Sequence, residues 1–144
     1  MAESALFRPG HIGAVETANR IVRAGTSETA SGDSGEITDH LLEIYENLAL
    51  NRVGLILSGH MFCHPRGRYA TWQTGIHDDA LVPGLTRLTS AVHRHRGKVF
   101  AQLAHAGSQS RVPENRPLAP SPVPNALTGR MVEAATAAPD PRRS

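Results

Sequence analysis

The chain has 144 residues, of which 40% are hydrophobic and 19% charged, and its formal net charge at pH 7 is +2. It contains no run of about 18 apolar residues, which a transmembrane helix would need, and a charge this small does not indicate nucleic-acid binding. The first residues do not resemble a secretory signal, and the single cysteine, Cys63, excludes an internal disulfide. These features predict a cytoplasmic globular protein of one domain that binds neither membranes nor nucleic acids.

The chain divides into two regions of different composition. Residues 1–112 alternate apolar runs with turn residues, whereas residues 113–144 contain seven of the ten prolines. Because proline neither continues a helix nor donates to a sheet, we expect residues 1–112 to be the folded domain. Residues 113–144 are expected to be a loop rich in Pro, Ala and Arg that is largely disordered. Within it, residues 127–138 are rich in alanine and free of proline, which favours a short helix.

Strands and helices alternate within the first region. A β-prone run at residues 20–24 precedes a helix predicted over residues 38–50, whose apolar side chains recur on one face. Thr38 is the expected N-cap of this helix. Residues 53–58 form a continuous apolar run, as in a strand that is buried on both faces.

A second helix and a third strand follow. The helix is marked by the spacing of Leu81, Leu85, Leu88 and Val92. Pro83 suits its first turn, and Gly97 suits the C′ position after its end. Residues 98–103 then form a third apolar strand. This order predicts an α/β fold with parallel strands, because parallel neighbours need crossover helices.

The carboxyl ends of the predicted strands carry the residues with the most chemistry. In parallel α/β folds, ligands bind at these ends, which here are residues 24–28, 59–61 and 102–107. Glycines in the first two segments allow a flat ligand to approach the backbone. The amide of Gln102 both donates and accepts hydrogen bonds, which suits the edge of a flavin or pyrimidine ring.

Several sequence blocks have the order and spacing of one enzyme family. The most specific is Gln-Leu-Ala-His-Ala-Gly at residues 102–107. The other blocks lie at residues 6–9, 12–13, 19–22, 53–57, 65–68, 75–79, 88–93 and 119–122. Over residues 5–128 the chain therefore resembles the old yellow enzyme family of FMN-dependent NADH:flavin oxidoreductases, which includes 2,4-dienoyl-CoA reductase.

The resemblance implies a (β/α)8 barrel with FMN at its carboxyl mouth and NAD(P)H as the reductant. The positions implied to contact the flavin are Ala24, Gly25, Thr26, Ser27, His60 and Gln102. Gln102 would hydrogen-bond the pyrimidine ring and Ser27 would approach the flavin O4 edge, while His60 stands where well-known members have a small residue. The implied reaction transfers a hydride from reduced flavin to an activated alkene, such as an enone or enoyl compound.

The chain is shorter than the family pattern. A complete barrel needs about 250 residues, and the predicted elements stop after the third strand. The family's substrate-binding histidines, proton-donating tyrosine and phosphate contacts belong to later segments, so no catalytic residue is assigned. We expect the N-terminal portion of a barrel, with about three parallel strands and two helices. It would be a truncated oxidoreductase that binds FMN weakly or not at all and is weakly active or inactive. The alternatives are a non-catalytic fragment that forms homo-oligomers through exposed sheet edges, and a stand-alone α/β binding domain.

The eight histidines allow a different interpretation. His93 with His95, and His60 with His64, have spacings found in metal sites, and Cys63 lies between two of these histidines as a candidate nucleophile. His93 and His95 fall near a predicted helix C-terminus, where a cation interacts favourably with the helix dipole. Three neighbours in one loop do not make an oriented triad. We therefore predict no metal site and no cysteine nucleophile.

Overall fold

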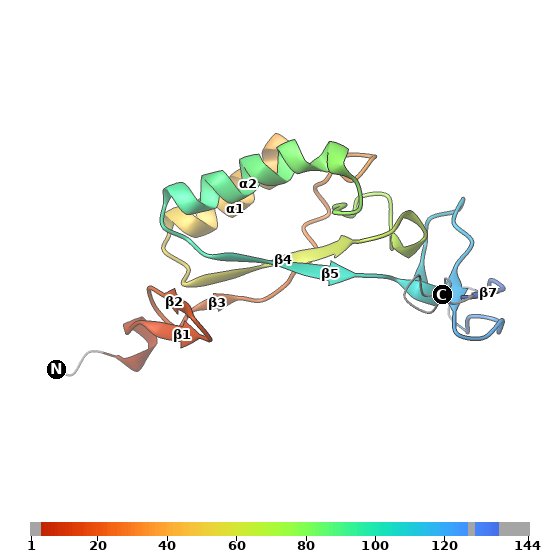
Figure 1. The fold of residues 1–144 in the computed structure, drawn as a ribbon, viewed down its shortest axis with the longest axis horizontal. Coiled ribbons are helices and arrows are strands. Elements are labelled where there is room, and N and C mark those ends of the chain that lie inside the picture. Colours follow the sequence, from red (N-terminus) through yellow and green to blue (C-terminus); the bar gives the residue numbers. More distant parts are fainter. Residues whose placement is uncertain (1–3, 127–128, 136–144) are drawn as a thin grey trace, which may run out of the picture.

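A three-stranded parallel sheet lies at the centre of the computed structural model, which describes residues 4–126 and 129–135. Its strands are adjacent in the order β3-β4-β5, with bounds Val22–Arg23, Leu55–Phe62 and Val99–Ala104. Helices α1 (Asp39–Leu50) and α2 (Val82–Arg94) connect these strands and lie on the same side of the sheet (Figure 1). This arrangement confirms the predicted alternation of strands and helices and the parallel pairing.

Smaller elements lie at the two ends of the central sheet (Figure 1). An antiparallel hairpin of β1 (Gly10–Ile12) and β2 (Val15–Thr17) precedes β3, and a parallel pair of β6 (Leu118–Ala119) and β7 (Glu133–Ala134) follows β5. Short 3₁₀ turns are formed by Ala5–Phe7, Pro65–Gly67, Asp79–Leu81 and Gly107–Gln109.

The core lies between the two helices and the sheet. Its buried apolar cluster consists of Ile37, Leu41, Tyr45, Ala49, Ile56, Leu88 and Val92. Thr38 caps α1 as predicted, because its hydroxyl accepts the Leu41 N–H at 3.1 Å. Pro83 lies in the first turn of α2, also as predicted.

The end of α2 differs from the prediction. Arg96, and not Gly97, takes the left-handed position, with φ = 58°. The Gly97 N–H then bonds to the Val92 carbonyl at 3.1 Å, which completes a Schellman motif. A glycine is nevertheless needed at position 97, because a Cβ there would lie 3.0 Å from Cβ of Ala49. The prediction that Gly97 is the C′ residue was therefore wrong, because Arg96 occupies that position. Glycine at position 97 is required for packing instead.

Strand β4 is longer than its prediction of residues 53–58. It continues to Phe62, and both of its faces are largely covered. His60 therefore lies inside β4, where it is the register partner of Gln102 in β5. The first strand is shorter than expected, since β3 comprises Val22–Arg23 of the predicted residues 20–24.

The helix predicted over residues 127–138 was wrong over residues 129–135. There Met131 forms a bridge with Pro124, and β7 pairs with β6. Residues 127–128 and 136–138 lie outside the described residues. The part of the predicted loop that is described thus contains two short strands, whereas the division of the chain at residue 112 stays a prediction.

Contacts from Arg130 explain why the alanine-rich segment does not become a helix. Its guanidinium donates to the carbonyls of Val112 at 3.1 Å and Pro113 at 3.2 Å. These bonds tie the segment to residues far away in the chain. Tertiary contacts here override the local helix propensity of alanine.

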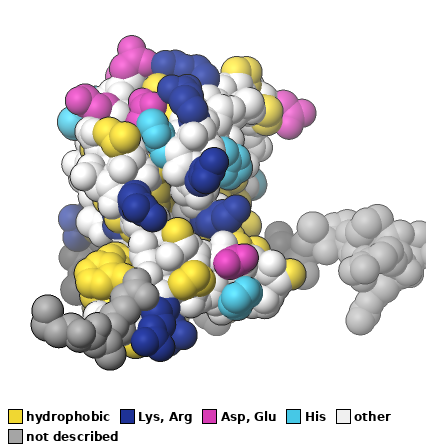
Figure 2. All heavy atoms as spheres, turned by 90° about the vertical axis from the view of Figure 1, so that its left-hand side faces the viewer, with side chains coloured by type: hydrophobic (Ala, Val, Ile, Leu, Met, Phe, Trp, Pro, Cys, Tyr) yellow, Lys and Arg dark blue, Asp and Glu magenta, His cyan; other side chains and the backbone are white. Residues whose placement is uncertain are grey.

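The described surface carries charges of both signs. On the face shown in Figure 2, Lys and Arg side chains are interspersed with Asp, Glu and His. Among the described residues, no helix has the length and apolar character that a membrane span requires.

Candidate functional site

The residues predicted to face a flavin lie together at the carboxyl ends of β3, β4 and β5. Residues 24–27 follow β3 directly, and Gln102 lies beside His60 on the neighbouring strand. Ala24, Gly25, Thr26, Ser27 and Gln102 are all exposed. We call these five residues the platform.

Gly25 and Gln102 approach each other closely across the sheet. A Cβ on Gly25 would overlap with Oε1 of Gln102 and lie 2.9 Å from the Ser58 carbonyl oxygen. The Ser58 hydroxyl, which is fully buried, accepts the Gln102 N–H at 2.9 Å. Glycine at position 25 thus allows an amide side chain to lie directly against bare backbone.

The platform suits a planar heteroaromatic ring. The Gln102 amide presents both a donor and an acceptor at an exposed position. The Thr26 hydroxyl donates to the Ala24 carbonyl at 3.2 Å, so it folds back onto its own turn. Bare backbone with a mixed donor and acceptor group beside it matches the pyrimidine edge of an isoalloxazine, so the residues present fit that group.

A buried ionic network lies behind the platform, and the sequence analysis did not identify it. The Glu28 carboxylate, 7% exposed, lies 2.8 Å from Nη1 of Arg23 and accepts the Tyr45 hydroxyl proton at 2.9 Å. The Gly59 N–H donates to the Tyr45 hydroxyl oxygen at 3.0 Å. Burial, followed by the nearby charge of Glu28, raises the pKa of Tyr45. The network holds the end of the 24–28 segment against β4.

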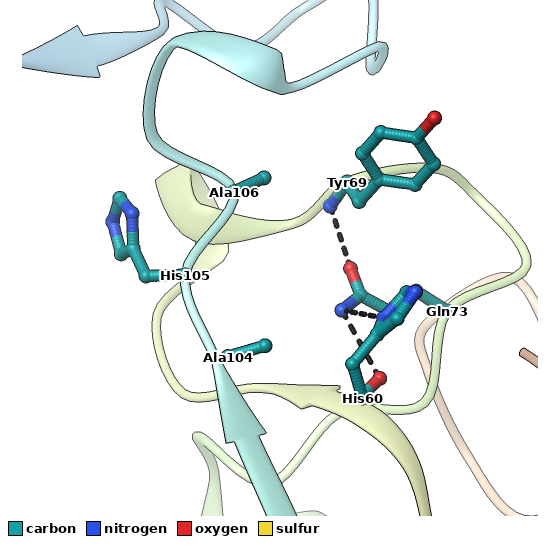
Figure 3. Close-up of a pocket in the computed structure, with 6 residues that line it drawn as sticks. All are labelled: His60, Tyr69, Gln73, Ala104, His105 and Ala106. Atoms are coloured by element: carbon teal, nitrogen blue, oxygen red, sulfur yellow. Dashed lines mark hydrogen bonds between the residues drawn. The ribbon is translucent and has the colours of Figure 1, made fainter. Parts of the chain in front are cut away.

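A pocket of about 200 Å³ adjoins the platform through His60, which lines the pocket and is the register partner of Gln102. Figure 3 shows the residues around this pocket. The pocket is lined by His60, Tyr69, Gln73, Ala104, His105 and Ala106. Figure 3 shows the methyl groups of Ala104 and Ala106 pointing toward Tyr69 and His60, whereas the ring of His105 points the other way. The pocket is therefore bounded by small apolar groups on one side and by rings on the other.

Gln73 is the most buried residue of this pocket, and the sequence analysis missed it. Its side-chain oxygen Oε1 accepts the Tyr69 N–H at 2.5 Å. Its nitrogen Nε2 lies 2.7 Å from Nδ1 of His60 and 3.1 Å from the His60 carbonyl oxygen. The sequence around Gln73 does not indicate its contact with His60, because the two residues are 13 positions apart in the chain.

The histidine pairs have other partners in the structure. His95 lies 3.2 Å from Glu46, and His60 contacts Gln73. Within residues 4–126 and 129–135, no group of three or more His, Cys, Asp or Glu side chains is placed to hold a metal ion. The exposed Cys63 thiol donates to the Ala104 carbonyl at 3.4 Å.

Comparison with known proteins identifies the family. The model of the NADH:flavin oxidoreductase / NADH oxidase family matches residues 5–139. The chain belongs to this family. The match confirms the resemblance seen in the sequence.

Two curated proteins show the same relationship. The chain is 38% identical over 128 residues to a metal reductase of Desulforamulus reducens. This alignment covers 88% of the chain and 19% of that protein. It is 34% identical over 128 residues to an NADH oxidase of Thermoanaerobacter brockii, covering 86% and 20%, respectively. The chain thus spans about a fifth of the length of these relatives.

A solved structure supports the fold. The old yellow enzyme homologue of Zymomonas mobilis superimposes with a TM-score of 0.79 at 28% identity, over 93% of this chain and 40% of that one. The likeness confirms the predicted fold class, the N-terminal portion of a (β/α)8 barrel. Within the described residues the sheet has three parallel strands and is not a closed barrel.

Proposed function

We propose that the platform is the ring-binding part of an FMN site in an NAD(P)H-dependent ene reductase. The observation that carries the proposal is the contact of the Gln102 amide with the backbone of Gly25 at an exposed sheet end. A flat ring can lie on the bare backbone there while its pyrimidine edge bonds to the amide. The family membership of the chain supports this choice of ligand.

Each platform residue has a role in the proposal. Gln102 orients the ring through its amide, and the backbone of residues 24–27 supports one edge. Ser27 supplies an exposed hydroxyl near the flavin O4 edge, and His60 stands beside the ring on β4. The bound flavin would supply hydride transfer from the nicotinamide to an activated alkene. The substrate is then a small molecule with a carbonyl-conjugated double bond.

A flavin titration of the purified chain tests this proposal. We expect weak but saturable quenching of flavin fluorescence, with FMN and riboflavin bound about equally because the proposed contacts reach only the ring. Gln102→Ala should weaken binding about tenfold, since it removes a hydrogen-bonding group worth about 1.4 kcal/mol.

Gln109→Ala is the matched control, because Gln109 is an exposed glutamine outside the platform. It should bind flavin like the wild type. Absence of saturable quenching, or equal affinities of the wild type and Gln102→Ala, would contradict the proposal.

One observation favours a second candidate function, the association of two copies through sheet edges. In the described part of the chain, β5 pairs only with β4, and Leu103 in β5 is 65% exposed. An unpaired strand edge with an apolar side chain is a template for another chain. Light scattering of the purified protein tests this candidate, and a monomer at all concentrations would exclude it.

A further inference from the structure

The residues around His60 determine the hydrogen-bonding state of its side chain, which lines the pocket. The rest of the lining consists of Ala104, Ala106, Tyr69, the buried Gln73, and His105, whose ring points away from the other residues (Figure 3). Which imidazole nitrogen carries the proton decides whether the pocket offers a ligand a donor or an acceptor.

Two backbone groups fix the orientation of the Gln73 amide. The Tyr69 N–H can only donate, and it lies 2.5 Å from Oε1 of Gln73. The His60 carbonyl can only accept, and it lies 3.1 Å from Nε2 of Gln73. The amide oxygen must therefore face the Tyr69 N–H, and the amide nitrogen must face the His60 carbonyl. Because Gln73 is 2% exposed, the amide is held by these protein partners rather than by solvent.

The orientation of this amide determines the tautomer of His60. Nε2 of Gln73 has a second hydrogen, and Nδ1 of His60 lies 2.7 Å from it. A donor at this distance requires a lone pair on Nδ1, so the neutral imidazole carries its proton on Nε2. Among the described residues, none accepts a hydrogen bond from Nε2 of His60. This nitrogen is not one of the fully buried side-chain atoms that lack a partner, so it is accessible to a ligand.

We propose that Nε2–H of His60 donates a hydrogen bond to the carbonyl oxygen of a ligand with a single flat ring bound in this pocket. Gln73 is the positioning residue that keeps the proton on Nε2. An apolar cavity of about 150 Å³ holds benzene, so a pocket of about 200 Å³ has room for one substituted ring. The pocket adjoins the platform, so the ligand would be the substrate of the proposed enzyme. In this respect the inference rests on the proposed function, which it deepens.

The tautomer is tested directly by nitrogen-15 NMR of the histidine rings. In the wild type we expect the His60 ring to show the correlation pattern of the Nε2–H form. Gln73→Met, which keeps the side-chain length but removes both polar atoms, should give a mixture of the two tautomers. A wild-type ring in the Nδ1–H form would overturn the proposal, and this measurement does not depend on how well the variant folds.

Ligand binding is tested without flavin, with acetophenone and α-methylstyrene as probes. The two molecules have the same shape, but only acetophenone has a carbonyl oxygen. Binding is followed by the NMR signals of the Ala104 and Ala106 methyl groups. Acetophenone should bind about tenfold more tightly than α-methylstyrene. His60→Phe should abolish this preference, and His93→Phe on the exposed surface of α2 should retain it.

Equal affinities for the two probes, or a preference that persists in His60→Phe, would overturn the proposal. The result is independent of the flavin titration because no flavin is present. A lost carbonyl preference with intact flavin binding would refute only the role of His60, whereas an intact preference without flavin binding would refute only the proposed FMN site.

Discussion

Glu28 carries a carboxylate that is 7% exposed and that meets Arg23 and Tyr45 behind the platform. A buried charge of this kind depends on its partners, because removing one partner leaves the other charge without compensation in a poorly hydrated environment. The three residues come from the end of β3, the following loop and α1. Their interaction therefore joins the platform to the helix layer.

Glu28→Gln is expected to destabilise the fold. It keeps the shape of the side chain but leaves the guanidinium of Arg23, 18% exposed, without its counter-charge. We expect a loss of about 3 kcal/mol in the free energy of unfolding, measured by urea denaturation. Arg87→Gln, which removes an exposed ion pair with Asp39, should cost less than about 1 kcal/mol. Equal effects of the two variants would contradict the role of burial.

Tyr45 makes stability depend on pH in the alkaline range. Burial, followed by the charge of Glu28, raises its pKa, so the unfolded chain loses this proton first, near pH 10. The folded state then binds more protons than the unfolded state, and the free energy of unfolding falls as pH rises above about 10. Tyr45→Phe should make this fall shallower between pH 9 and about 11, measured by urea denaturation at each pH. An unchanged slope in Tyr45→Phe would refute this origin.

The two helices of the central layer share an unusual way of ending. Arg52 after α1 and Arg96 after α2 both have positive φ, at 61° and 58°. Glycine normally occupies this position, because a Cβ there approaches the neighbouring carbonyl oxygen. Both arginines thus adopt a strained conformation that the following residue's hydrogen bond to the last turn maintains.

Arg96→Gly is expected to stabilise the protein. Glycine adopts the left-handed conformation without strain, so the free energy of unfolding should rise by about 0.5–1 kcal/mol. Arg87→Gly, in the interior of the same helix, should instead lower it by about 1 kcal/mol. Urea denaturation of both variants checks the pair of signs, and a loss of stability in Arg96→Gly would refute the strain.

At the scale of the whole molecule, the described sheet is open at β5. Phe100 and Leu103 in this strand are 36% and 65% exposed, whereas β4 is covered on both faces. Parallel sheets are normally buried, so an open strand of this kind favours pairing with further strands. The exposed edge is therefore the feature of the molecule most suited to association.

Leu103→Lys is expected to reduce association through this edge. A lysine on an edge strand discourages pairing because its charge would have to be desolvated. Light scattering should show a lower average mass for this variant than for the wild type at the same concentration. Leu50→Lys, at a similarly exposed apolar position on α1, is the control and should leave the mass unchanged. The same mass in all three proteins would contradict pairing through β5.

Local patterns in the sequence determined the order of strands and helices, the N-cap at Thr38 and the grouping of Gly25, His60 and Gln102 at one sheet end. These features follow from periodicity, turn residues and the direction of parallel strands, which are set by neighbouring residues. The family motifs led to the correct family for the same reason, because they are read as short blocks along the chain.

Only the tertiary structure decided the Gln73–His60 and Glu28–Tyr45 contacts, the left-handed conformation of Arg96 and the strand at residues 133–134. The polar contacts and the strand depend on groups from separate segments, and the position of Arg96 depends on the close packing of Gly97 against Ala49. Gln73 and His60 are 13 residues apart, and Tyr45 and Glu28 are 17 apart. No helix or strand period links residues at such separations, so the buried polar contacts that shape the pocket and support the platform become visible only when the elements pack.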